Sequence, residues 1–185
     1  MARYNLRCPL SDEDARMLRA GDVVFLSGTI YTARDAAHKR LCDMLDRGDP
    51  LPFDCKGAVI YYVGPTPAPE GQAVGVAGPT TSYRMDSYAP RLYSLGCKAS
   101  IGKGKRSEAV RQSLEEYGGV YFGATGGAGA LLSMCIEAAK VIAFDDLGPE
   151  AVRELTVRNF PVLVINDAHG GNFYVTPDRK ADGLE

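Results

Sequence analysis

Apolar and polar positions along the chain follow two different periods, which separate the expected strands from the expected helices. Short, dense apolar runs are typical of buried strands. They occupy positions 22–27, 58–63, 99–101, 120–122, 141–144 and 161–165. In other stretches apolar residues recur at helical spacing, and we expect these stretches to form helices. They are 34–46, 86–95, 107–117, about 130–138 and 150–158.

Capping residues and glycines mark where several of these elements begin and end. Ser11 and Asp14 predict a helix start with an acid in the first turn, and Gly21 is a natural stop. The Gly118–Gly119 pair is expected to end the helix that starts near position 107. The stretch 64–78 is rich in Gly and Pro and therefore predicts a loop.

The alternation of strands and helices predicts an α/β fold. Some expected strands are joined by loops alone, so we expect a mixed sheet with flanking helices rather than a wholly parallel sheet. A chain of 185 residues with 45% hydrophobic residues buries one core, and we expect a single domain over residues 1–185. The polar stretch 177–185 is expected to be a loose tail.

The charge distribution argues against a polyanionic partner. The formal net charge is −2, and Lys and Arg are spread along the chain rather than massed, so we expect no nucleic-acid binding. The first residues lack the apolar stretch of a secretory signal, and no later run is long enough to cross a bilayer. We therefore expect a cytoplasmic protein with no membrane partner.

The cysteines and histidines do not predict a metal site within this chain. Five cysteines are scattered without a closely spaced pair, and we interpret them as reduced, mostly buried thiols. His38 and His169 are the two histidines. A metal site would need ligands brought together from distant segments, so none is expected here.

Three junctions between apolar runs and loops or helices carry cations that predict an anion site. Thr80 and Arg84 lie four residues apart in a turn, Arg34 lies at an expected strand-to-helix corner, and Lys103 follows an expected strand end. Guanidinium groups and free backbone donors bind carboxylates well, and three such corners suit a small carboxylate with two or more negative charges.

Each of these signals also has a purely structural interpretation. For Arg34, Thr80 and Arg84 it is a helix cap with surface ion pairs. The run of Lys103, Lys105 and Arg106 is equally typical of a solvated basic loop, although Gly102 and Gly104 would let the backbone approach a ligand.

Three further features have structural interpretations that we favour. His38 shares a helix face with Arg34 and either contacts a substrate carboxylate or orients Asp35, but a lone histidine is usually structural. His169 lies in a turn-rich stretch, which favours turn chemistry over catalysis. The glycine loop 123–129 lacks the order of a phosphate-binding loop, and we interpret it as close helix–strand packing or as a turn facing a substrate or partner.

The same stretches resemble the β-type catalytic domain of the iron–sulfur hydro-lyases, a family that includes class I fumarases and L(+)-tartrate dehydratases. The resemblance covers roughly residues 5 to 175, and its segments occur in the family's order. They are Ser27-Gly28-Thr29-Ile30, Thr32-Ala33-Arg34-Asp35-Ala36-Ala37-His38, Pro52-Phe53, Gly64-Pro65-Thr66, Gly75, Gly78-Pro79-Thr80-Thr81, Arg84-Met85-Asp86, Gly102-Lys103-Gly104 and Gly123-Ala124-Thr125-Gly126-Gly127.

The resemblance implies a swivelling β/β/α-type domain and a division of labour between two chains. In that family, an α-type part holds a [4Fe-4S] cluster through three cysteines, and the β-type part resembles this chain. Because the scattered cysteines here do not supply the cluster motif, the resemblance implies one subunit of a two-chain enzyme. Its expected partner is the α-type subunit, in an α2β2 heterotetramer.

The resemblance also assigns roles to residues at the matching positions. Arg34, Arg84 and Lys103 would bind the substrate carboxylates, and Thr80 would transfer the proton. Asp35, His38, Thr81 and Asp86 stand beside them as supporting residues. An aliphatic hydroxyl such as that of Thr80 is a poor base unless nearby positive charge lowers its proton affinity.

The implied activity is the reversible hydration of fumarate to L-malate. Dehydration of L(+)-tartrate to oxaloacetate and hydration of another dicarboxylate remain open alternatives, as does a dicarboxylate-binding module without catalysis. The sequence departs from the common family pattern at Lys105, where asparagine is expected, and at Tyr83, where a small residue is usual. Either departure bears on substrate choice.

Overall fold

The computed structural model describes residues 1–124 and 128–175. The middle of the predicted glycine loop and the predicted tail at 177–185 lie outside the described residues.

The described residues form one sheet of seven strands, and the sheet is mixed, as the sequence predicted. The strands are β1 (Arg3–Cys8), β2 (Val23–Thr32), β3 (Val59–Tyr61), β4 (Ala99–Gly102), β5 (Val120–Gly123), β6 (Ile136–Ala143) and β7 (Val152–Asn166). Their order is β1-β2-β3-β4-β5-β7-β6, and β2 also pairs with β7. Strands β1 to β5 are mutually parallel, whereas β7 is antiparallel to β2, β5 and β6. Because β7 pairs with both β5 and β2, the strands from β2 to β5 and β7 form a closed ring of pairings.

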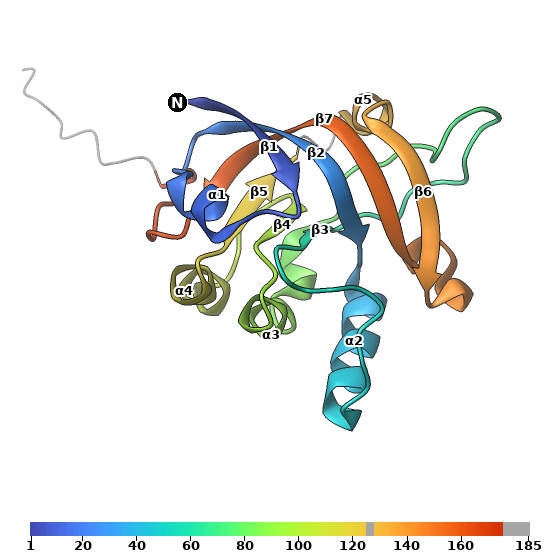
Figure 1. Cartoon of the computed structure of the whole chain (residues 1–185), viewed down its shortest axis with the longest axis horizontal. Coiled ribbons are helices and arrows are strands. Elements are labelled where there is room, and N and C mark those ends of the chain that lie inside the picture. Colours follow the sequence, from blue (N-terminus) through green and yellow to red (C-terminus); the bar gives the residue numbers. More distant parts are fainter. Residues whose placement is uncertain (125–127, 176–185) are drawn as a thin grey trace, which may run out of the picture.

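Several of the helices lie together on one side of this ring. The helical elements are α1 (Asp12–Met17), α2 (Asp35–Arg47), the 3₁₀ turn η1 (Ser82–Met85), α3 (Ala89–Ser94), α4 (Glu108–Tyr117), α5 (Gly129–Ser133) and the 3₁₀ turn η3 (Asp145–Glu150). Helices α2, α3 and α4 lie beside β3, β4 and β5, while the long strands β2, β7 and β6 arch over the opposite side (Figure 1). This layering confirms the α/β fold with flanking helices and fits a β/β/α arrangement.

Two apolar clusters fill the spaces between these layers. Successive side chains of a strand point to opposite faces. Accordingly, Val59 and Tyr61 of β3 belong to a cluster enclosed by the strands. Ile60 lies in a second cluster, with Leu41 of α2 and Leu114 of α4. Strands β3 to β5 are therefore buried on both faces, which explains their continuous apolar runs.

Most of the predicted caps are confirmed. Ser11 and Asp14 form a reciprocal capping box at the start of α1, but this helix ends at Met17 rather than near Gly21. Ser107 caps the start of α4, and Gly118 ends it in the left-handed conformation with φ of 65°. The stretch 64–78 contains no helix or strand, as expected for a loop.

Two predicted helices are wrong. Helix α5 ends at Ser133 and the chain continues into β6, so the helix predicted at 130–138 is a short turn followed by a strand. The stretch 150–158 lies mostly in β7, a single strand of 15 residues. Asn159 has φ of 49° near a register shift against β2. This irregularity shifts the apolar alternation by one residue and hides the period of two in the sequence.

Candidate anion-binding site

Two of the predicted cationic residues meet around one carboxylate. Arg34 lies between the end of β2 and the start of α2, and Arg84 lies in η1. Their guanidinium nitrogens lie 3.7 Å and 3.9 Å from Asp35 Oδ1. The fold therefore brings together two arginines that are 50 positions apart in the numbering.

Thr80, Thr81 and Lys103 form a second group. The Thr80 amide donates to the Tyr62 carbonyl that follows β3, at 2.7 Å. Thr81 forms a parallel bridge with Lys103, which directly follows β4. The next amide, of Ser82, donates to the Lys103 carbonyl at 2.9 Å. The segment with both threonines thus lies alongside the turn with Lys103.

Both groups lie at the same edge of the sheet. Strands β2, β3 and β4 are parallel neighbours, so their carboxyl ends meet there. The Arg34 side chain is 22% exposed and that of Arg84 is 47% exposed. Lys103 is also exposed. The cations are thus accessible on an open face.

Two glycines let these segments approach one another closely. A Cβ on Gly102 would overlap Ser82 Oγ, so the closeness of η1 to the end of β4 depends on this glycine. A Cβ on Gly64 would lie 3.1 Å from Arg34 Nη1 and 3.3 Å from the Pro149 carbonyl oxygen. The Arg34 side chain therefore packs closely against the backbone of Gly64.

One acidic residue beside these cations, Glu150, was not predicted from the sequence. Its Oε1 pairs with Arg34 Nη2 at 2.8 Å, and its Oε2 accepts from the Ala36 amide at 3.3 Å. The stretch was expected to be helical, whereas Glu150 ends the 3₁₀ turn before β7. No local pattern in the sequence indicates a pair separated by more than a hundred positions.

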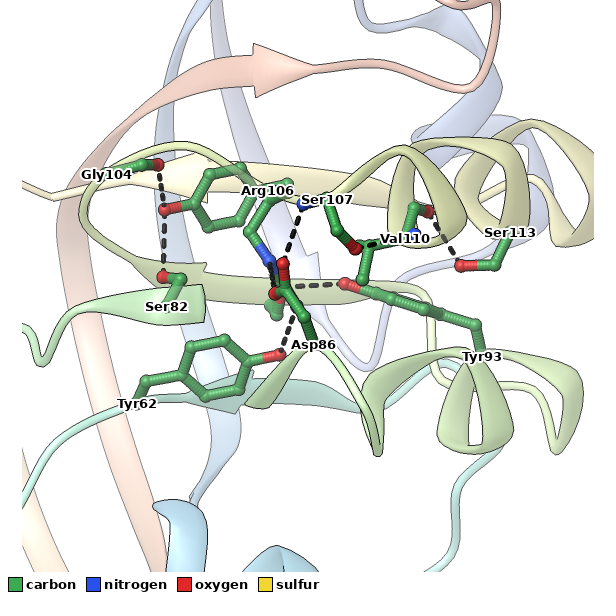
Figure 2. Close-up of polar contacts among 11 residues, drawn as sticks. Tyr62, Ser82, Asp86, Tyr93, Gly104, Arg106, Ser107, Val110 and Ser113 are labelled. Atoms are coloured by element: carbon green, nitrogen blue, oxygen red, sulfur yellow. Dashed lines mark hydrogen bonds and ion pairs between the residues drawn. The ribbon is translucent and has the colours of Figure 1, made fainter. Parts of the chain in front are cut away.

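A buried ion pair joins the two segments that carry the cations (Figure 2). Arg106 Nε donates to Asp86 Oδ1 at 2.7 Å, and the Ser107 amide donates to Asp86 Oδ2 at 2.6 Å. The Arg106 guanidinium lies 5.3 Å and 4.9 Å from the ring centres of Tyr62 and Tyr121. The solvated-loop interpretation is therefore wrong for Arg106. Asp86 acts here as a structural partner.

Tyr121 holds the turn that follows Lys103. Its hydroxyl donates to the Gly104 carbonyl at 2.9 Å and lies 2.9 Å from Ser82 Oγ. Because the Tyr121 proton goes to Gly104, the Ser82 hydroxyl is the donor of the second bond. The turn, the threonine segment and β5 are thus tied together behind the cations.

The histidines have structural contacts. His38 is fully buried, and its Nδ1 lies 2.8 Å from the Arg34 carbonyl, which requires a protonated Nδ1. Burial, together with Arg106 nearby, lowers the pKa of His38 to about 4, although the bond to Arg34 opposes the shift. His169 Nε2 bonds the Arg16 carbonyl at 2.7 Å, and its amide donates to Asp167, which favours the turn interpretation.

The two departures from the family pattern occupy different environments. Tyr83 lies between Thr80 and Arg84 in sequence and is 65% exposed. Lys105 lines a cavity of about 270 Å³ with Arg106 and Arg111. Lys103 is not among the residues that line this cavity, so Lys103 and Lys105 lie on different surfaces of the turn.

The described residues hold no cluster of metal ligands. Within residues 1–124 and 128–175, no group of three or more His, Cys, Asp or Glu side chains is placed to bind a metal ion. Cys55 and Cys97 are buried, and all five cysteines are free thiols. An iron–sulfur cluster therefore does not fit the cysteines of this chain. In the same ranges, no helix has the length and hydropathy needed to span a bilayer.

The chain is similar in sequence to fumarate hydratases and to a tartrate dehydratase subunit. The family described as "Fumarase C-terminus" matches residues 1–177. Fumarate hydratase 2 of Leishmania major is 42% identical over 83% of this chain and 28% of that protein. The aerobic class I fumarate hydratase of Salmonella typhimurium is 40% identical over 93% of this chain and 30% of its own length. A protein of Methanocaldococcus jannaschii, described as a candidate L(+)-tartrate dehydratase β subunit, is 40% identical over 92% of this chain and 91% of its own length. The chain thus spans under a third of these fumarate hydratases but nearly all of the β subunit.

Proposed function

This chain belongs to the fumarase C-terminal family, and from that premise we propose that it is the β subunit of a two-subunit iron–sulfur hydro-lyase. The proposed reaction is the reversible hydration of fumarate to L-malate. One observation carries the proposal. Arg34 and Arg84 meet at Asp35, while Lys103 lies beside Thr80 and Thr81 at the same sheet edge.

Two separate groups of cations suit a substrate with two carboxylates. A guanidinium offers parallel donors that match the two oxygens of a carboxylate, and an ammonium provides a compact positive charge. Holding both ends of a small dicarboxylate fixes the carbon atoms that react. The same cations stabilise the enolate-like charge that forms when a proton leaves the carbon beside a carboxylate. We assign the transfer of that proton to the Thr80 hydroxyl.

The local charge supports a site completed by a second chain. Arg34, Arg84 and Lys103 are accompanied by the carboxylates of Asp35 and Glu150. These groups leave one net positive charge, which does not neutralise a dicarboxylate dianion. We therefore assign the remaining attraction to the α-type partner, which would cover the open face.

The scattered cysteines support a cluster held outside this chain. We place the [4Fe-4S] cluster in the α-type subunit, because the described residues offer no matching ligand group. The two-chain organisation is supported by the M. jannaschii relative, because that protein is itself described as a β subunit and this chain covers 91% of its length. We propose an α2β2 heterotetramer.

L(+)-tartrate dehydration to oxaloacetate is the second candidate reaction. The near-complete coverage of a candidate tartrate dehydratase β subunit favours it. We prefer fumarate because no residue of this site specifically demands a second hydroxyl on the substrate.

Anaerobic co-expression with the α-type partner, followed by cluster reconstitution, tests the proposal. The assembled enzyme is expected to interconvert fumarate and malate faster than it consumes either tartrate enantiomer. Faster turnover of L(+)-tartrate would select the second reaction. A binding module would instead show tight dicarboxylate binding by this chain alone and no turnover in the complex.

A further inference from the structure

We propose that Glu150 is a positioning residue that holds Arg34 in the orientation needed to bind a substrate carboxylate. The inference rests on the proposed function for its link to catalysis. It places the connection between β6 and β7, which lies far from the other site residues in sequence, within the substrate site.

Glu150 uses its two oxygens for two different donors. Oε1 pairs with Arg34 Nη2 at 2.8 Å, whereas Oε2 accepts from the Ala36 amide at 3.3 Å. The first helical amides have no partner within a helix, and a negative charge is favourable at this end. One carboxylate therefore fixes the Arg34 side chain relative to the start of α2.

The turn that carries Glu150 is itself anchored to α2. Asp146 forms two bonds with Arg40, at 2.8 Å and 2.6 Å, and the Arg40 guanidinium lies 5.4 Å from the centre of the Phe144 ring. On the other side, the Thr32 hydroxyl donates to the Ala151 carbonyl at 3.2 Å. Glu150 thus lies between two attachments to β2 and α2.

Arg34 keeps capacity for a ligand after it pairs with Glu150. Its side chain is 22% exposed, and both of its ion pairs within the described ranges use Nη2. Nε is buried without an acceptor among the described residues and is not the atom that a ligand would reach. The aliphatic part of the side chain is confined beside Gly64, whose added Cβ would lie 3.3 Å from Arg34 Cδ. Because both the stem and one guanidinium nitrogen are held, a substrate would meet a guanidinium whose orientation is already set.

Glutamine at this position tests the idea with little change in volume. Glu150→Gln keeps one acceptor oxygen but replaces the other with a donor, so it cannot serve both Arg34 and the Ala36 amide. Glu137→Gln is the matched control because it makes the same chemical change at a carboxylate that pairs with Arg158 at 2.6 Å and leaves Arg34 and the Glu150 turn untouched. Glu150→Asp provides a second variant if Glu150→Gln does not fold.

In the assembled enzyme, Glu150→Gln is expected to raise KM for the dicarboxylate about tenfold and to change kcat by less than about threefold. Glu137→Gln should leave both constants near the wild-type values. Because Glu150 would act through Arg34, adding Glu150→Gln to Arg34→Ala should not raise KM further. An additive effect in this double variant, or an unchanged KM in Glu150→Gln, overturns the inference.

A measurement independent of activity separates this inference from the proposed function. Phenylglyoxal modifies accessible arginines, and peptide mass spectrometry of the full chain reports the rate at each one. Glu150→Gln should increase the rate at Arg34 by about threefold or more, with no change at Arg84. An unchanged rate at Arg34 overturns the positioning role even if the enzyme is active. Suppose that Glu150→Gln raises the modification rate at Arg34 but the wild-type complex is inactive. This result would support the positioning of Arg34 by Glu150 and overturn the hydro-lyase assignment.

Discussion

At the scale of single residues, neighbours decide what each charged side chain does. Lys103 is exposed at the sheet edge, whereas Arg106, three positions later, is buried between two aromatic rings and paired with Asp86. Removing one partner of a buried, hydrogen-bonded ion pair strongly destabilises the protein, because the other charge is left buried and unpaired. Arg106 therefore stabilises the turn that presents Lys103, although both belong to one basic run.

Thr80 is the proposed proton-transfer residue, and its removal is the direct test of that role. In the assembled enzyme, Thr80→Ala is expected to lower kcat by at least about a hundredfold, the usual contribution of a positioned acid or base. Thr81→Ala is the neighbouring control, and we expect a much smaller change. Turnover of Thr80→Ala within about threefold of wild type would place the base elsewhere, for example on the partner.

His38 predicts a specific dependence of stability on pH. Its folded pKa of about 4 lies below the ordinary 6.5, so on acidification the unfolded chain binds this proton first. The free energy of unfolding therefore falls as the pH drops from about 6.5 to about 4. Well above this range, His38 adds nothing to the dependence of the unfolding free energy on pH. Between about pH 7 and about pH 5 the contribution is about 2 kcal/mol.

Urea unfolding of wild type and His38→Gln at both pH values measures this term. The variant should lose about 2 kcal/mol less than wild type on acidification. If wild type and His38→Gln lost equal amounts of unfolding free energy, His38 would already be protonated in the folded protein at the lower pH, which contradicts the lowered pKa.

At the scale of elements, close contact between η1 and the end of β4 depends on Gly102. Gly102→Ala is expected to destabilise the protein by about 2 kcal/mol, because the new Cβ would overlap Ser82 Oγ. Ser82→Ala alone loses the bond to Tyr121 and should cost about 1 kcal/mol.

In the Gly102→Ala/Ser82→Ala double variant, the hydroxyl that causes the overlap is gone. We therefore expect a loss in unfolding free energy smaller than the sum of the two single losses, measured by denaturant unfolding. Strict additivity would mean that Ser82 Oγ is not the group that excludes a side chain at Gly102.

Elements whose signals are local were predictable, and elements defined by distant partners were not. Ser11 with Asp14 and Ser107 with Gly118 mark helix ends correctly because caps act within a few residues. The stretch 150–158 was misread because its strand identity comes from pairing with β2 and β6. Its apolar spacing is disturbed near Asn159, so the local pattern alone favoured a helix.

At the scale of the whole molecule, the open face of the site governs how tightly this chain alone binds a dicarboxylate. One net positive charge in partly exposed surroundings gives weak attraction for a dianion. We expect calorimetric titration with succinate to give a Kd at least about tenfold weaker for this chain alone than for the complex with its partner. Equal affinities would favour the binding-module alternative, because the site would then be complete within one chain.

The sequence by itself determined the α/β class, the loop at 64–78 and the residue types of the site. These follow from side-chain period, backbone freedom and functional-group chemistry, which are properties of neighbouring residues. Only the tertiary structure decided that Arg34 and Arg84 share Asp35, that Arg106 is buried, and that Glu150 joins the site. Those relations arise when the closed ring of strands brings distant segments to one edge. Although Arg34 and Asp35 are neighbours in the sequence, Arg84 and Glu150 come from segments far from both.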